Sequence, residues 1–342
     1  MTTATLQIHN YSVRLHTRAG SLHVVDDVSW SVWRGETLAL VGESGSGKTV
    51  SLMAALRLLP AHVICETGGR VLLNGRDVLS MADVELRGIR GAEVGVVFQD
   101  PLTAFNPGRR VGPQIAEPLR RHLQLHPKEA RRRATGVMAE VSLPDPASLY
   151  DAYPHELSGG MRQRALIAMA IAAGPSLLIA DEPTSALDVT TQAQLLSLLG
   201  RLQRERRMAM VLVSHDMGVV AAIADQVAVM YAGRIVEHGG SRAVLKTPDH
   251  PYTRGLLESI PDAGTTRGAY FRALPGMPPD LNAVGDGCRF ADRCRLVLDQ
   301  CIRAHPRLEA VRGDTPRDDV IHVSSCWRHP GVFVEAGEMN AK

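Results

Sequence analysis

A glycine-rich loop between a strand and a helix constrains this chain most. The segment GESGSGKT places Gly42, Gly47, Lys48 and Thr49 at the spacing G-x-x-x-x-G-K-S/T, after the apolar run TLALV and before a helix-compatible run. Glycines let backbone N–H groups face a phosphate, and the helix N-terminus adds the positive end of its dipole. Lys48 is expected to neutralise phosphate oxygens and the Thr49 hydroxyl to ligate Mg²⁺. The loop predicts a phosphate cradle formed by Gly42, Glu43, Ser44, Gly45, Ser46, Gly47, Lys48, Thr49 and Val50.

The rest of the chain alternates short apolar or β-rich segments with longer helical ones. This alternation indicates an α/β domain with a mainly parallel sheet. Central strands are predicted at Thr37–Val41, Val94–Phe98, Leu177–Ala180 and Met210–Val213. Helices are predicted at Lys48–Leu59, Gln114–Leu123, Lys128–Glu140, Gly160–Ala173 and Thr190–Arg206.

Length and composition leave room for two units. The chain has 342 residues, 45% hydrophobic and 22% charged, and its formal net charge is only +2. These values are ordinary for a globular protein and indicate no preference for nucleic acid. The N-terminus shows no signal peptide, and the apolar stretch Ala165–Ala180 is interrupted by Gly174 and Pro175. We expect a buried helix and a buried strand there, and any membrane association through a partner.

Two carboxylates end one of the predicted strands. In LLIADEP, Asp181 and Glu182 follow an apolar run, where a parallel sheet opens its ligand crevice. Alone, such a pair is commonly a helix-start signal. With the phosphate loop upstream, Asp181 is expected to hold Mg²⁺ and Glu182 to act as general base toward water.

The segment LSGGMRQR supplies a second candidate anion site. Ser158 can cap the following helix, and Gly159 and Gly160 leave its N-terminal amides uncovered. A bare S-G-G would be an ordinary capped helix. Here it stands in order with the other motifs, and together they resemble the ABC ATPase family: Walker A, a Q-loop at Gln99, the LSGG signature, Walker B, SALD ending at Asp188, and a switch histidine at His215.

The resemblance covers about residues 6–237 and implies a P-loop NTPase fold of ABC type. Its parts would be a parallel-sheet core, an N-terminal antiparallel β part, a helical subdomain at about residues 105–172, and a loop-rich, cysteine-containing C-terminal extension. The domain boundaries would be 1–240 for the ATPase and 241–342 for the extension.

The same resemblance implies a head-to-tail dimer of ATPase domains. ATP on the Walker A loop of one would be closed over by the LSGG helix of the other, so that each chain is half of two sites. Gln99 would contact Mg²⁺ and the attacking water, Asp188 would lie across the dimer seam, and His215 would reach the γ-phosphate. The family's adenine-stacking aromatic falls here on Leu15; His16 or Tyr11 could substitute, although Tyr11 also fits a strand core.

Flanking segments narrow the resemblance further. QDPLTAFNP, HPYTRGLL and GCRFADRC look like the oligopeptide and dipeptide importer ATPases over almost the whole chain. This implies a second ATPase subunit, a paralogue, two membrane permeases, an extracytoplasmic peptide-binding protein, and a peripheral place on the cytoplasmic face of the inner membrane. Nickel chelates or glutathione are alternative cargoes. A non-transport ABC ATPase is a further alternative, but neither a coiled-coil insertion nor a basic tract indicates nucleic acid.

Four cysteines cluster in the extension, which also has few candidate core residues. Their spacing is C-x5-C-x6-C-x24-C, which matches neither the usual zinc pairs nor the common ferredoxin patterns. The importer resemblance favours a 4Fe-4S cluster on Cys288, Cys294, Cys301 and Cys326, with Zn²⁺ or unligated thiols as alternatives. Its role would be structural, because the expected tail core is only Phe290, Leu296, Val297, Leu298 and Trp327.

Overall fold

The chain forms two compact units that interleave along the sequence. A computed structural model describes residues 4–17, 20–60, 62–185, 187–259, 274–282, 284–311 and 320–328. The first unit comprises Met1–Ile8, Ser31–Leu38 and Arg70–Val213; the second comprises His9–Trp30, Ala39–Gly69 and Ser214–Lys342.

The first unit contains three parallel strands in the order β6-β7-β8. These are β6 (Val94–Val97), β7 (Leu177–Asp181) and β8 (Ala209–Ser214), with β6 in register Val94 to Leu177 and β7 in register Leu177 to Ala209. Every residue of β7 and β8 is buried, as expected for parallel strands covered on both faces. The end of β4 (Ile64–Leu73) pairs antiparallel with β5 (Arg76–Asp77).

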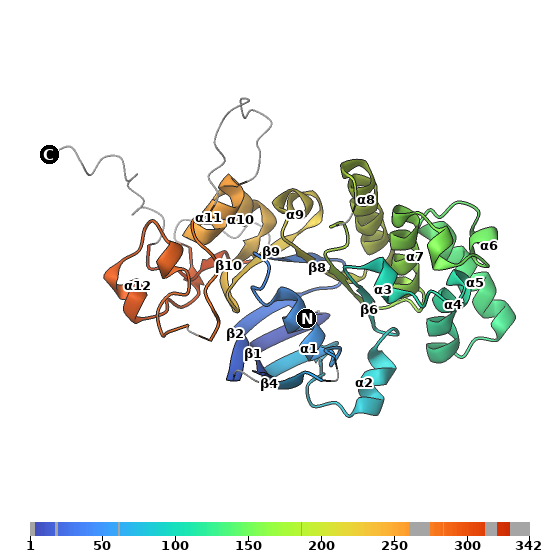
Figure 1. The fold of residues 1–342 in the computed structure, drawn as a ribbon, viewed down its shortest axis with the longest axis horizontal. Coiled ribbons are helices and arrows are strands. Elements are labelled where there is room, and N and C mark those ends of the chain that lie inside the picture. Colours follow the sequence, from blue (N-terminus) through green and yellow to red (C-terminus); the bar gives the residue numbers. More distant parts are fainter. Residues whose placement is uncertain are drawn as a thin grey trace. The chain divides into compact units, whose positions relative to one another are not determined.

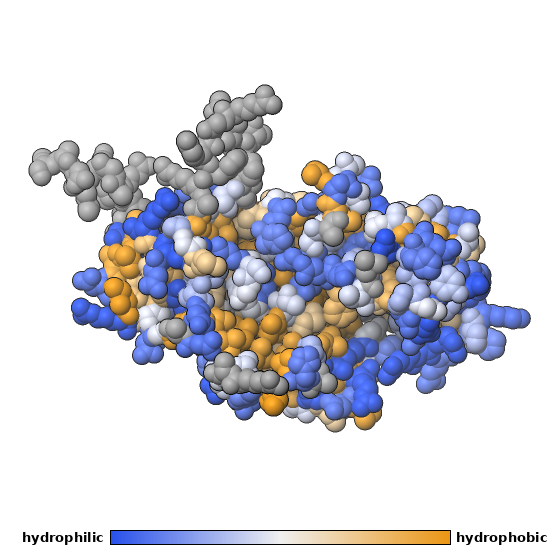
Figure 2. Space-filling model, in the orientation of Figure 1, coloured by the Kyte–Doolittle hydropathy of each residue, from blue (hydrophilic) through white to orange (hydrophobic). Residues whose placement is uncertain are grey.

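Helices from the middle of the first unit's sequence gather in one block (green in Figure 1), where α4 packs on α5 and α7. Pro127 begins α5, where its missing N–H costs nothing, and Ser158 caps α7. Figure 2 shows mainly hydrophilic residues over α4 to α6. The helices of this unit are α2 (Asp83–Ile89), α3 (Pro101–Ala104), α4 (Val111–His122), α5 (Pro127–Glu140), α6 (Pro146–Leu149), α7 (Gly159–Ile171) and α8 (Val189–Arg206).

In the second unit, strands follow in the order β11-β12-β10-β9-β3, and β9 pairs antiparallel with β10. Their bounds are β3 (Thr37–Val41), β9 (Gln226–Tyr231), β10 (Arg234–Gly240), β11 (Glu309–Ala310) and β12 (Val323–Ser324). Strands β2 (Gly20–Val32), β1 (Leu6–Thr17) and β4 neighbour one another in that order. The helices are α1 (Lys48–Ala55), α9 (Met217–Ile223), α10 (Ser241–Lys246), α11 (Pro251–Glu258) and α12 (Asp299–Arg303).

Three aromatic rings join the core of the second unit to the C-terminal segment. Tyr231 of β9 and Tyr252 of α11 have ring centroids 4.6 Å apart, and Phe290 lies 5.2 Å and 5.4 Å from them. All three are at most 3% exposed. The core around them also includes buried residues of β3, α9, β10 and α10, so the tail is anchored on this unit's own sheet.

The four predicted strands and five predicted helices are present, with ends shifted by a few residues. The apolar stretch from Ala165 onward forms the end of buried helix α7 and then buried strand β7. Among the described residues, no helix is both long and apolar enough to cross a bilayer. The expected tail core is partly wrong: Phe290 is buried, but Val297 and Trp327 are 42% and 38% exposed, because the segment around them is short and irregular.

Candidate nucleotide site

The Walker A loop of the second unit wraps around its own lysine. The Lys48 ammonium donates to the carbonyl oxygens of Gly42 at 2.7 Å and Glu43 at 2.8 Å, and to Ser46 Oγ at 3.3 Å. Lys48 is only 5% exposed. A buried ammonium needs such acceptors, and phosphate oxygens are stronger partners of the same kind.

Two glycines of the loop have no tolerable substitute. Gly42 has φ 150°, and a Cβ there would lie 2.1 Å from the Met230 carbonyl oxygen. Gly47, at φ 101°, would place a Cβ 2.5 Å from the Val24 carbonyl oxygen. Both positions therefore require the absence of a side chain. The remaining loop residues vary in exposure: Ser44, Gly45 and Thr49 are exposed, Val50 is half-buried, and Ser46 is buried.

Glu43, inside this loop, has two partners that sequence reasoning missed. Its backbone N–H donates to the Tyr252 hydroxyl at 2.8 Å. Its carboxylate accepts from both terminal nitrogens of Arg293, at 2.6 Å and 2.9 Å. Tyr252 belongs to HPYT, a segment that contributed only to the family resemblance and that begins helix α11 through the His250 cap. No signal in the local sequence of Arg293 could have identified this contact.

In the first unit, the predicted catalytic residues Gln99 and Glu182 meet. Gln99, just after β6, donates through Nε2 to Glu182 Oε2 at 3.0 Å. Asp181 ends β7 and is 5% exposed. Glu182 has φ 44°, a left-handed conformation that is uncommon outside glycine and concentrates at functional positions. Its backbone is held by a 3.0 Å bond from its N–H to the Val213 carbonyl oxygen.

Ser158 occupies the helix cap predicted for it, and Asp188, predicted to lie at a dimer seam, also caps a helix. Ser158 Oγ accepts from the Met161 N–H at 3.3 Å at the start of α7, which begins with Gly159 and Gly160. Asp188 accepts from the Thr191 N–H at 3.0 Å at the start of α8, and this bond lowers the pKa of the Asp188 carboxyl. The Asp188 carboxylate is therefore charged at neutral pH.

The structure also bears on the unassigned adenine contact. Tyr11 is fully buried within β1, and this excludes its ring as a stacking surface. His16 remains a third exposed and lies 2.9 Å from Glu66 Oε1, while Leu15 is half-buried. His215 directly follows β8, and its side chain is exposed. It belongs to the second unit.

The four C-terminal cysteines line one small cavity in the second unit, together with His250 and Phe290. All four are free, and burial raises the pKa of Cys288 to about 11 and that of Cys326 to about 12. Backbone N–H groups of Leu296 and Arg328 donate to Cys294 Sγ and Cys326 Sγ at 3.4 Å. Even so, within the described part of the chain no three Cys, His, Asp or Glu side chains are arranged to hold a metal ion.

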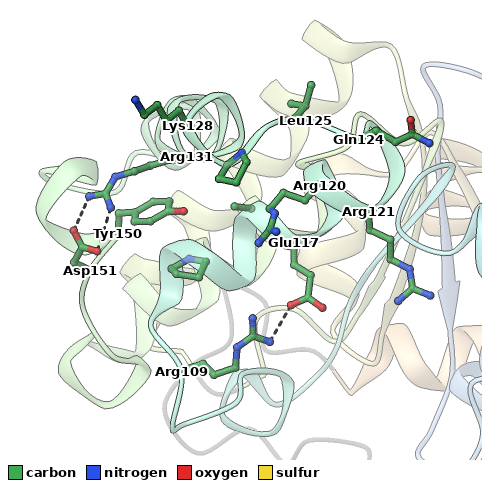
Figure 3. A pocket seen from close by; sticks show the side chains of 13 residues that line it. Arg109, Glu117, Arg120, Arg121, Gln124, Leu125, Lys128, Arg131, Tyr150 and Asp151 are labelled. Atoms are coloured by element: carbon green, nitrogen blue, oxygen red, sulfur yellow. Dashed lines mark hydrogen bonds and ion pairs between the residues drawn. The ribbon is translucent and has the colours of Figure 1, made fainter.

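A larger pocket lies among the helices of the first unit (Figure 3). Its volume is about 880 Å³, and its wall carries the ion pairs Arg109–Glu117 at 2.9 Å and Arg131–Asp151 at 2.6 Å. None of the predicted nucleotide residues lines it. This pocket is therefore distinct from the predicted phosphate cradle, despite its basic wall.

Known proteins agree with this fold and these motifs. Residues 25–185 match the ABC transporter family, and residues 236–301 match the C-terminal region of oligopeptide/dipeptide transporters. A dimeric ATP-binding cassette solved in a post-hydrolysis state with ADP and phosphate superimposes with a TM-score of 0.61 at 26% identity, over 69% of this chain and 99% of that one. Fold and motifs together define an ATPase of the ABC type.

Full-length relatives define the family more narrowly. The dipeptide transport ATP-binding protein DppD of Bacillus subtilis is 44% identical, over 94% of this chain and 94% of that protein. The oligopeptide transport ATP-binding protein OppD of the same organism is 41% identical, over 96% and 90%. The chain belongs to this family of oligopeptide/dipeptide transporter ATP-binding proteins.

Proposed function

We propose that this chain is the ATP-hydrolysing subunit of a membrane importer that couples ATP binding and hydrolysis to uptake of di- and oligopeptides. The Walker A loop carries the proposal, because its carbonyl oxygens hold the Lys48 ammonium and its backbone requires glycine at positions 42 and 47. The match to the transporter C-terminal region supports peptides as cargo. Nickel chelates or glutathione are alternative cargoes.

The hydrolytic step is assigned to the first unit. Glu182 takes the proton of the attacking water as general base, and Gln99 orients its carboxylate through the 3.0 Å hydrogen bond. The left-handed backbone at Glu182 sets the direction in which its side chain leaves the chain. His215 would contact the γ-phosphate, a role carried over from the family motif.

The oxygen donors available suit Mg²⁺. The Asp181 carboxylate, the Thr49 hydroxyl and the Gln99 amide oxygen are hard ligands of the type that Mg²⁺ prefers. These three residues would hold the ion, and bound Mg²⁺ would neutralise charge on the phosphates. Asp181 stands at the end of a fully buried strand, which limits how far its carboxylate can move from the proposed Mg²⁺ position.

Each chain would contribute to two nucleotide sites in a dimer of ATPase subunits. Ser158, Gly159 and Gly160 would present the start of α7 to ATP held by the partner, where uncovered amides attract phosphate. Asp188 would lie at the dimer seam with its charge retained. The partner is proposed to be a paralogue, and both would bind two permeases at the cytoplasmic face of the inner membrane, served by an extracytoplasmic peptide-binding protein.

The ATPase domain would span residues 1–240 and the extension residues 241–342. We include a 4Fe-4S cluster on Cys288, Cys294, Cys301 and Cys326 in the proposal, with Zn²⁺ as the alternative. Thiol sulfurs that line one cavity, two of them receiving backbone N–H bonds, support this proposal. Anaerobic purification should give a coloured protein containing iron. A colourless protein with stoichiometric zinc would exclude the cluster.

Replacing the proposed base tests the hydrolytic assignment. Glu182→Gln should leave ATP binding intact and lower ATP turnover at least about 100-fold, because the amide cannot accept the proton. Turnover of the purified complex and equilibrium ATP binding should be measured together. Glu140→Gln is a matched control: Glu140 is an exposed carboxylate of the same unit, paired with Arg206 at 2.6 Å. Normal turnover by Glu182→Gln would remove Glu182 as the base.

A further inference from the structure

The Walker A loop is held by side chains that lie far outside it in the sequence. Glu43 is fixed at three groups: its N–H by the Tyr252 hydroxyl, its carbonyl oxygen by Lys48, and its carboxylate by Arg293. Tyr252 and Arg293 lie 209 and 250 positions further along the chain. All of these residues belong to the second unit. The loop's geometry is therefore set partly by the C-terminal segment.

Arg293 is itself rigidly placed. Its side chain is 5% exposed, against 26% for Glu43. Its Nε donates to the Pro275 carbonyl oxygen at 2.7 Å, and one terminal nitrogen also donates to the Tyr231 hydroxyl at 3.3 Å. The guanidinium lies over the Tyr231 and Phe290 rings at 5.7 Å and 5.9 Å. A fork held this firmly can impose one position on the carboxylate that it binds.

The pairing has an electrostatic consequence for a phosphate cradle. A carboxylate within a loop that binds a triphosphate repels its ligand unless a cation neutralises it. Arg293 supplies that cation from a nearly buried position, where solvent screens the interaction little. It also keeps the loop backbone ordered, so that less conformational entropy is lost when phosphate binds.

We infer that Arg293, assisted by Tyr252, is a positioning residue for ATP: it acts through Glu43 to order and neutralise the Walker A loop, and so sets the affinity for nucleotide. The inference rests on the proposed ATPase function and adds a determinant outside the known motifs. Arg293 directly precedes Cys294, which lines the cysteine cavity. One short segment therefore contacts the Walker A loop and also contributes to the cysteine cavity.

The test is the dissociation constant of Mg²⁺-ATP for the purified full-length chain, measured by calorimetry. Arg293→Gln should raise it at least about fivefold, the lower end of typical coupling between sites. Tyr252→Phe, which removes a single hydroxyl, should raise it about twofold to threefold. Arg293→Lys keeps the charge but loses the two-pronged contact and should fall between wild type and Arg293→Gln.

A double variant tests whether Arg293 acts through the Glu43 carboxylate or whether its replacement simply destabilises the second unit. Arg293→Gln leaves an unpaired carboxylate in the loop, so adding Glu43→Gln should tighten ATP binding relative to Arg293→Gln alone. Arg206→Gln is the matched control, because it breaks another arginine–carboxylate pair, that with Glu140 at 2.6 Å in the first unit. It should change the ATP affinity by less than about twofold, as expected for a site without shared partners.

The outcomes are distinct. Unchanged ATP affinity in Arg293→Gln, no tightening of ATP binding when Glu43→Gln is added to Arg293→Gln, or an equal loss in Arg206→Gln would each overturn the inference. If Arg293→Gln does not fold, as judged by circular dichroism, Arg293→Lys decides: unchanged affinity overturns the inference and weaker affinity supports it. A wild-type chain that binds no ATP would instead contradict the proposed function.

Discussion

At the scale of single residues, Glu43 is where the contacts of the phosphate loop converge. Three groups of one residue are bound by three different side chains, and two of these come from the C-terminal segment. A loop held in this way presents its amides in one arrangement before a ligand arrives. Preorganised donors bind an anion more tightly than donors that must be ordered first.

Local motifs made some of these residues predictable and left others hidden. The glycines and Lys48 could be identified because the chemistry that a phosphate requires is written in eight consecutive residues. Tyr252 and Arg293 could not, because neither the start of helix α11 nor the short 3-10 turn that ends at Arg293 indicates a partner more than 200 residues away. Tyr11 illustrates the reverse case, because only its complete burial excludes it as an adenine contact.

His238 predicts how stability responds to acid. Burial, and then the charge of His322, lowers the pKa of His238 from 6.5 to about 4, and its Nε2 lies 3.0 Å from Gln226 Oε1. The unfolded chain therefore binds the proton more readily. The contribution of neutral His238 to the free energy of unfolding is complete above a pH of about 6.5 and is lost as the pH falls toward 4, by on the order of 3 kcal/mol.

Urea unfolding followed at pH 7, 6 and 5 checks this expectation. The free energy of unfolding should fall more steeply with acidity in wild type than in His238→Gln, which cannot take up the proton. Equal slopes for the two proteins would show that His238 does not titrate as described.

At the scale of elements, the predictable strands were those buried on both faces. Strands β7 and β8 are continuous apolar runs, and their sequences predict burial without knowledge of a partner. Strand β10 reads RIVEHGG, with a glutamate and two glycines that disfavour a strand. This segment forms a strand because it pairs with β9 and, through Glu237 and Ser324, with β12. Such long-range pairing is not visible in a local pattern.

Helix α5 offers a test of local propensity. Gly136 is exposed within α5, and a Cβ added there would meet nothing within 4 Å. Gly136→Ala should therefore raise the free energy of unfolding by about 0.5–1 kcal/mol. Gly174→Ala is the matched control: its surroundings are also open, but its φ of +77° strains any side chain. It should lower stability, and a gain there would contradict the backbone argument.

At the scale of the whole molecule, the predicted motifs are shared between two interleaved units. The Walker A loop lies in the second unit, while Gln99, Asp181, Glu182 and the LSGG helix lie in the first. The motif content, and with it the ABC class, could be predicted because each motif is contiguous. Cargo could not, since nothing in the nucleotide residues recognises a peptide, and the assignment depends on the C-terminal match.

The most direct test of the central claim is ATP turnover by the complex that co-purifies with this chain, reconstituted in lipid vesicles with its binding protein. We predict that di- and oligopeptides stimulate ATP turnover and accumulate in the vesicles only when ATP is present. Stimulation and accumulation with a nickel chelate or glutathione, but with no peptide, would contradict the assignment of this chain to peptide import.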